Sequence, residues 1–108
     1  MDNKIYSFLG LAKKAGKLFS GDETCEKNVK SGKACLVLIS ADASGNTRKK
    51  FFDICSFRGV DIRFFGEKEL IGRYIGKEIR SVVAITDKGF AKRLIEMIDV
   101  QDLERGGV

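Results

Sequence analysis

Residues 34–39 read Ala-Cys-Leu-Val-Leu-Ile, a continuous apolar run of strand length. The run does not alternate between apolar and polar residues, which indicates that both faces of this strand are covered in the fold. A strand covered on both faces lies inside a sheet that carries helices on each side. The sequence therefore predicts that residues 34–39 form a central strand.

Segments of helical periodicity alternate with strand-like segments along the whole chain. The pattern predicts helices at residues 3–15, 20–31, 46–57, 67–75 and from 88 to about 100, and strands at 18–19, 34–39, 60–64 and 82–85. This order favours an α/β fold, a three-layer α/β/α sandwich with a mixed four-stranded sheet. We expect one domain at residues 1–100, followed by a frayed tail at 101–108 where the periodicity is lost.

The composition suits a folded domain that lacks the commonest catalytic side chain. The 108 residues are 44 % hydrophobic and 32 % charged, enough for one core with a charged surface. Histidine, the commonest general base near neutral pH and the commonest zinc ligand, is absent. Cys25, Cys35 and Cys55 fall at apolar positions, where buried free thiols are expected. We expect no catalytic residue, metal, cofactor or small-molecule substrate, and no enzymatic activity.

The sequence carries no signal for a membrane or for export. No apolar run approaches the roughly 20 residues of a membrane span, and residues 1–4, Met-Asp-Asn-Lys, do not begin a signal sequence. An odd number of cysteines argues against a disulfide framework. We expect a cytoplasmic protein without membrane contact.

The net charge of +5 lies entirely in the first half of the chain. Residues 1–50 hold ten Lys and Arg against five Asp and Glu, whereas residues 51–108 hold ten of each. A one-sided basic surface attracts the phosphates of nucleic acid. The alternative is a basic surface that serves solubility alone.

The basic residues of the first half form three groups. They are Lys13, Lys14 and Lys17; Lys27, Lys30 and Lys33; and Arg48, Lys49 and Lys50. Residues three apart on a helix share a face, so Lys27 and Lys30 are expected to point together toward phosphate. For any single lysine, a solvated helix face is an equal explanation.

Residues 20–32 read Ser-Gly-Asp-Glu-Thr-Cys-Glu-Lys-Asn-Val-Lys-Ser-Gly. Together with residues 9–17, 32–44 and 85–91 they resemble the kink-turn-binding ribosomal-protein superfamily of the L7Ae type, and within it the bacterial YlxQ-type RNA-binding proteins. The likeness covers nearly the whole chain in order. It implies an α/β/α sandwich that binds structured RNA, ribosomal RNA among the candidates, in a ribosome or another ribonucleoprotein particle, without catalysis.

The resemblance also implies where RNA binds. The superfamily reads the sheared G·A pairs of a kink-turn with the start of its second helix, through a Gly-x-Asn-Glu-x-x-Lys pattern. Here Gly21 and Lys27 are kept, and Glu23-Thr24 replaces Asn-Glu. A second contact surface is implied at residues 76–81, where apolar and basic side chains pack against an extruded nucleotide. The expected RNA-binding residues are Lys17, Gly21, Asp22, Glu23, Thr24, Lys27, Lys30, Arg48, Lys77, Ile79 and Arg80.

Three alternatives stay open at these positions. Ser20 and Glu23 form a capping-box pattern, so Glu23 can complete a helix cap instead of accepting hydrogen bonds from RNA bases. Ile79 can fold inward. The domain can also be a protein-interaction adaptor that keeps the fold but has lost kink-turn readout.

Overall fold

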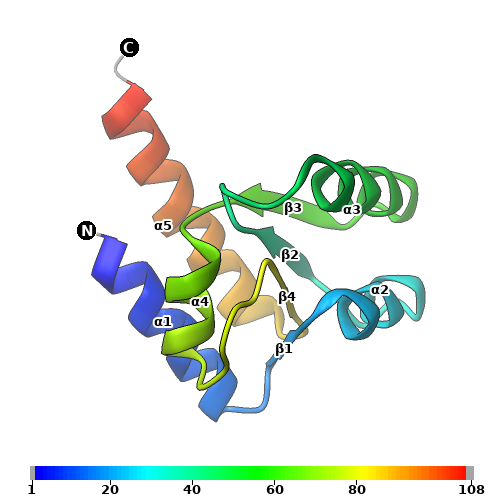
Figure 1. The fold of residues 1–108 in the computed structure, drawn as a ribbon, viewed down its shortest axis with the longest axis horizontal. Helices are drawn as coiled ribbons and strands as arrows, with labels where there is room; N and C mark the ends of the chain where they lie inside the picture. The colour runs from blue at the N-terminus through cyan, green and yellow to red at the C-terminus, as the bar shows by residue number, and fades with distance from the viewer. Residues whose placement is uncertain (1, 107–108) are drawn as a thin grey trace.

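Four strands form one mixed sheet with helices between them in the chain (Figure 1). The computed structural model describes residues 2–106. In chain order the elements are α1 (Asp2–Lys14), β1 (Leu18–Ser20), α2 (Asp22–Lys30), β2 (Leu36–Ile39), α3 (Gly45–Arg58), β3 (Asp61–Phe64), α4 (Lys68–Tyr74), β4 (Val82–Ile85) and α5 (Lys88–Gly106). The strand order is β1-β4-β2-β3, with β2 and β3 parallel and the other two pairs antiparallel. The expected mixed α/β fold is confirmed.

Helices cover both faces of the sheet, which makes the fold a three-layer sandwich (Figure 1). Leu36 and Leu38 of β2 belong to the core beneath α1, α4 and α5. Val37 and Ile39 point the other way, into the core beneath α2 and α3. All four side chains are fully buried. The prediction of a central strand covered on both faces is therefore confirmed.

The last helix extends further than the sequence pattern predicts. Every other element begins and ends within two residues of its expected bounds, but α5 continues from residue 88 to Gly106. The frayed tail predicted at 101–108 is therefore wrong for 101–106, and residues 107–108 lie outside the described part. Gln101 is buried, three residues after Ile98 on the same helix face. This polar residue interrupts the apolar pattern of the helix, so the pattern did not predict that the helix continues past residue 100.

No helix among residues 2–106 is long and apolar enough to cross a membrane.

The segment between α4 and β4 lies directly against α4, because Gly72 has no side chain. A Cβ at Gly72 would overlap the backbone carbonyl group of Glu78. The Lys77 N–H donates to the Gly72 carbonyl oxygen at 2.8 Å. The position of residues 76–81 therefore depends on a glycine at 72.

Gly72→Ala should destabilise the fold by about 1–3 kcal/mol, because backbone at Glu78 must move to admit a methyl group. The matched control is Gly45→Ala at the start of α3, where an added Cβ meets no atom within 4 Å. That change should be neutral or stabilise by about 0.5 kcal/mol through the unfolded chain. Urea unfolding of both variants measures the difference, and equal effects would contradict the close approach.

The three cysteines differ in their surroundings. Cys25 and Cys55 are buried between α2, α3 and the sheet, whereas Cys35 is partly exposed. Burial raises the pKa of the Cys25 thiol to about 12 and that of Cys55 to about 11, and Asp22 adds to the rise at Cys25. The expectation of buried thiols is confirmed for Cys25 and Cys55 and wrong for Cys35, which lies just before β2 begins.

Iodoacetamide at pH 8 should therefore alkylate Cys35 first in the native protein, because the thiolate is the nucleophile and its formation is suppressed at Cys25 and Cys55. Peptide mass spectrometry over time reports the order. In about 6 M guanidinium, which unfolds most small domains, all three should react alike. Native labelling of Cys25 as fast as Cys35 would contradict the burial of Cys25 beneath α2.

Candidate nucleic-acid interface

The second helix starts immediately after the edge strand β1, with one glycine between them. Gly21 has φ 99° and ψ 152°, in a region open to glycine, and its N–H donates to the Val82 carbonyl oxygen at 3.1 Å. No side chain caps α2. The predicted capping box is wrong, because Ser20 still pairs with Val83 in the sheet and the cap position falls on Gly21.

The first turn of α2 consequently presents backbone donors and exposed polar side chains. The opening N–H groups of a helix have no partner within it, and the helix dipole makes this end partly positive. Asp22, Glu23 and Thr24 are all exposed there. Such an end binds electronegative atoms of a ligand.

Residues 76–81 lie beside this turn, although they are distant in the chain. Arg80 Nε donates to Ser20 Oγ at 3.1 Å, and the Arg80 guanidinium also donates to the Ile79 carbonyl oxygen at 2.9 Å. Ile79 is 52 % exposed, so it does not fold inward, and Lys77 is exposed as well. The structure thus brings together the two segments that the sequence marked as contact surfaces.

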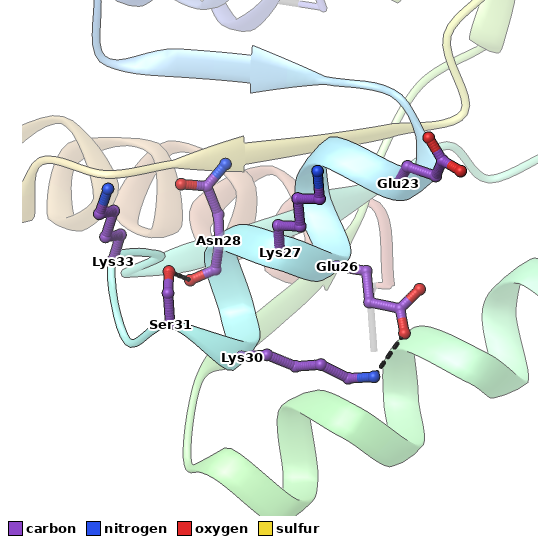
Figure 2. Close-up of a pocket in the computed structure, with 7 residues that line it drawn as sticks. All are labelled: Glu23, Glu26, Lys27, Asn28, Lys30, Ser31 and Lys33. Atoms are coloured by element: carbon purple, nitrogen blue, oxygen red, sulfur yellow. Dashed lines mark hydrogen bonds and ion pairs between the residues drawn. The ribbon is translucent and has the colours of Figure 1, made fainter.

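The lysines of α2 point to different sides of the helix. In Figure 2, Lys27 and Asn28 of α2 and Lys33 just beyond it extend toward β1, whereas Lys30 extends toward α3. Lys30 Nζ lies 2.6 Å from Glu26 Oε2. The expectation that Lys27 and Lys30 point together is wrong, because Glu26, four residues before Lys30, holds its ammonium group on the opposite side.

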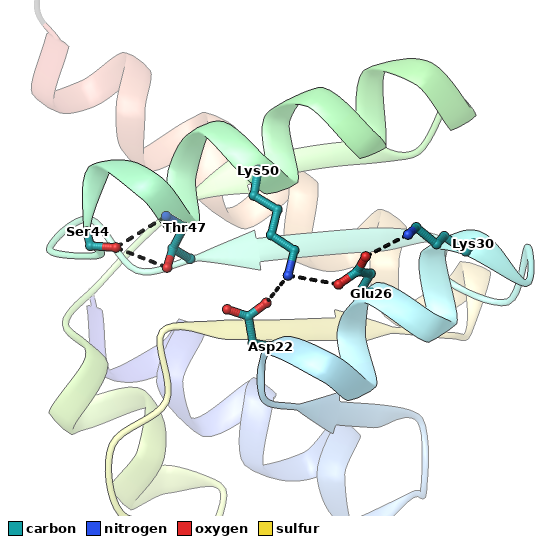
Figure 3. Close-up of polar contacts among 6 residues, drawn as sticks. All are labelled: Asp22, Glu26, Lys30, Ser44, Thr47 and Lys50. Atoms are coloured by element: carbon teal, nitrogen blue, oxygen red, sulfur yellow. Dashed lines mark hydrogen bonds and ion pairs between the residues drawn. The ribbon is translucent and has the colours of Figure 1, made fainter.

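Four charged residues link α2 to α3 in what we call the α2–α3 charge network: Asp22, Glu26, Lys30 and Lys50. Lys50 Nζ lies 2.8 Å from both Asp22 Oδ1 and Glu26 Oε1 (Figure 3). Hydrogen bonds from Lys30 and Lys50 lower the pKa of Glu26 to about 2, and hydrogen bonds to Asp22 and Glu26 raise the pKa of Lys50. Two cations of the first half, Lys30 and Lys50, are thus paired with carboxylates within the protein. Ser44 caps α3 nearby.

Two other expected site residues occupy different places. Arg48 lies over the ring of Phe64 on β3, 5.3 Å from the ring centroid. Since residues two apart on a helix are about 200° apart, Arg48 faces away from the side on which Lys50 meets α2. Lys17 lies just before β1, where its carbonyl oxygen accepts from the Thr86 N–H at 3.0 Å. The backbone of Lys17 is therefore fixed beside Thr86 at the end of β4, whereas Arg48 lies over β3.

A shallow hollow beside α2 adds three residues that the sequence did not single out, Phe19, Asn28 and Thr86, to three that it did. We call it the Phe19 hollow, and its lining residues are Phe19, Thr24, Lys27, Asn28, Lys33 and Thr86. They come from β1, α2 and the segments after α2 and β4. Only their tertiary arrangement groups them. Among residues 2–106, no three His, Cys, Asp or Glu side chains gather as a metal site would require.

Comparison with known proteins agrees with this architecture. Residues 3–95 match the model of the family described as Ribosomal protein L7Ae/L30e/S12e/Gadd45. The chain is 44 % identical over 94 residues to the RNA-binding protein YlxQ of Bacillus subtilis, covering 87 % of this chain and 94 % of that protein. It is 41 % identical over 97 residues to the RNA-binding protein YlxQ of Enterococcus faecium, covering 89 % and 92 %.

A solved structure, of a protein with unknown function from Bacillus halodurans, has a TM-score of 0.85 to this chain at 38 % sequence identity. The similarity covers 89 % of this chain and 97 % of that one. Sequence and fold similarity therefore each extend over most of the chain, and the chain belongs to the Ribosomal protein L7Ae/L30e/S12e/Gadd45 family.

Proposed function

We propose that this protein binds structured RNA, without catalysis, through the first turn of α2 together with residues 76–81. The observation that carries the proposal is the hydrogen bond from Arg80 to Ser20, which holds the exposed Ile79 beside the start of α2. The Bacillus and Enterococcus relatives are named RNA-binding proteins, and the family name is that of ribosomal proteins. This kinship supports the same class of ligand.

The chemistry at the start of α2 suits the edges of bases. Lys50 already neutralises Asp22, so Glu23 is the carboxylate of this turn that faces a ligand without an ion pair among the described residues. A carboxylate repels phosphate but accepts hydrogen bonds from the amino and imino groups of bases. Thr24 can donate or accept beside it. Free backbone N–H groups of the same turn add donors.

The surrounding side chains suit the sugar-phosphate backbone. Lys27 lies one turn beyond Glu23 on the exposed side, and Lys77 and Arg80 lie on the neighbouring segment. Their charges attract phosphate, while Ile79 offers an apolar contact for a nucleotide turned out of the helix. Lys30 and Arg48, which the sequence also suggested, are left out of this surface because they face α3 and β3.

The ligand that fits both segments is an RNA duplex with an internal bulge of the kink-turn type, in ribosomal RNA or another ribonucleoprotein of the cytoplasm. A duplex end alone presents no extruded nucleotide to Ile79. The alternative, a protein-interaction adaptor with the same fold, would contact neither bulge nor duplex and gives opposite results in the tests below.

Lys27→Ala should weaken binding of a bulged RNA duplex about tenfold, since a hydrogen bond to a charged group contributes about 1.5 kcal/mol or more. It should also reduce the slope of log affinity against log salt by about one. The matched control is Lys30→Ala, which removes the same charge from the α3 side of the same helix. Fluorescence anisotropy at several salt concentrations measures both. Equal losses in the two variants would contradict the assigned surface.

Ile79→Ala should weaken the same RNA by roughly tenfold, the loss of about 1–2 kcal/mol of apolar contact with an extruded nucleotide. Its stability should hardly change, because the side chain is 52 % exposed. Leu103→Ala on the distal part of α5, 78 % exposed, is the control that should bind like the wild type. A wild type that binds no bulged RNA but does capture a protein would favour the adaptor.

A further inference from the structure

Phe19 is an aromatic side chain exposed on the edge of the sheet. It pairs with Ala84 of β4, which belongs to the core beneath α2 and α3. Directly opposed residues of an antiparallel pair project to the same face, so Phe19 lies on the α2 side. It is 40 % exposed there. An accessible ring face next to a helix is a stacking platform for a base.

The surroundings of this ring are positive. Lys27 and Lys33 line the Phe19 hollow, and their ammonium groups extend to the same side of α2 in Figure 2, with Asn28 between them. Neither lysine lies within ion-pair distance of a carboxylate in the described chain. None of the six lining residues is acidic. Asp87, next to Thr86, accepts from the Phe90 N–H at the start of α5.

The polar groups of the hollow leave an acceptor for a base. Asn28 Nδ2 donates to the Thr24 carbonyl oxygen at 3.0 Å, which fixes the amide and leaves its Oδ1 to accept. Thr86 Oγ1 donates to the Lys17 carbonyl oxygen at 3.4 Å. The hollow therefore combines a ring face, two cations and one oriented acceptor. A nucleotide matches each of these with its base, its phosphate and its exocyclic amino group.

We propose that the Phe19 hollow binds one unpaired nucleotide flanking the structured RNA, with its base stacked on Phe19 and its phosphate between Lys27 and Lys33. The inference rests on the proposed function and extends its surface from the start of α2 across the β1 side of that helix. Lys27 lies at the junction, where it lines the hollow and also follows Glu23 by one helical turn.

The test uses the full chain and three forms of one bulged RNA duplex. The first form is blunt, the second carries four unpaired adenosines, and the third carries four abasic ribose phosphates with the same charge. Each extension is placed at either end in separate RNAs. The adenosine form should bind at least about fivefold more tightly than the abasic form at one end, since stacking on an aromatic residue contributes about 1–3 kcal/mol per base.

Phe19→Ala should abolish that difference without changing affinity for the blunt RNA, and Phe19→Tyr should restore it. Phe52→Ala, which removes an exposed ring from α3, is the matched control and should keep the difference. Equal affinity for adenosine and abasic extensions at both ends, or a difference that survives in Phe19→Ala, would overturn this inference while leaving the proposed function in place. Failure of the wild type to bind even blunt RNA would overturn both.

Discussion

The antiparallel pairing of β1 with β4 is the constraint that creates the proposed surface. Leu18 lies opposite Ile85 and Ser20 opposite Val83, so the chain leaving β1 and the chain entering β4 meet at one end of the sheet. β4 is held in turn by β2, whose residues are buried on both faces. The first turn of α2 and residues 76–81 are neighbours for this reason, and the bond from Arg80 to Ser20 joins them. Gly72 then lets residues 76–81 lie close against α4.

Internal ion pairs decide which of the many cations can serve a ligand. Glu26 and Asp22 engage Lys30 and Lys50 between α2 and α3, and Lys49 pairs with Asp53. These exposed pairs contribute little to stability one by one, but they hold three ammonium groups near carboxylates. Lys27 and Lys33, which have no such partner among the described residues, lie on the β1 side of α2 instead. Counting charges along the sequence therefore overestimates how many cations on the α3 side are available to a ligand.

Most of the fold could be predicted from local pattern. The apolar run at residues 34–39 predicts the buried strand β2. Glycines predict where helices end: Gly32, for example, has a positive φ where the chain turns after α2. The end of α5 was missed because Gln101 takes a core position. The start of α2 was misjudged because β1 extends through Ser20.

The candidate site could be proposed from the sequence only where its residues are continuous in the chain. Residues 21–27 and 76–81 could be proposed from their likeness to a family, and the structure places them side by side. Glu26, the partner of Lys30, also forms an ion pair with Lys50 on α3. Lys50 lies twenty residues beyond Lys30 in the chain, so no local spacing reveals this contact. The Phe19 hollow likewise joins side chains from β1, α2 and the end of β4. Interactions of this kind depend on tertiary packing and lie beyond sequence periodicity.

The most direct measurement of the RNA-binding surface is a titration of isotope-labelled protein with a bulged RNA duplex, followed by amide NMR shifts. The account predicts that the largest changes in amide chemical shift fall on the first turn of α2, on Lys27 and Asn28, and on residues 77–80. The chemical shifts of the α5 amides should stay unchanged. Shifts concentrated on the outer side of α3 and on β3, around Arg48 and Phe64, would contradict it.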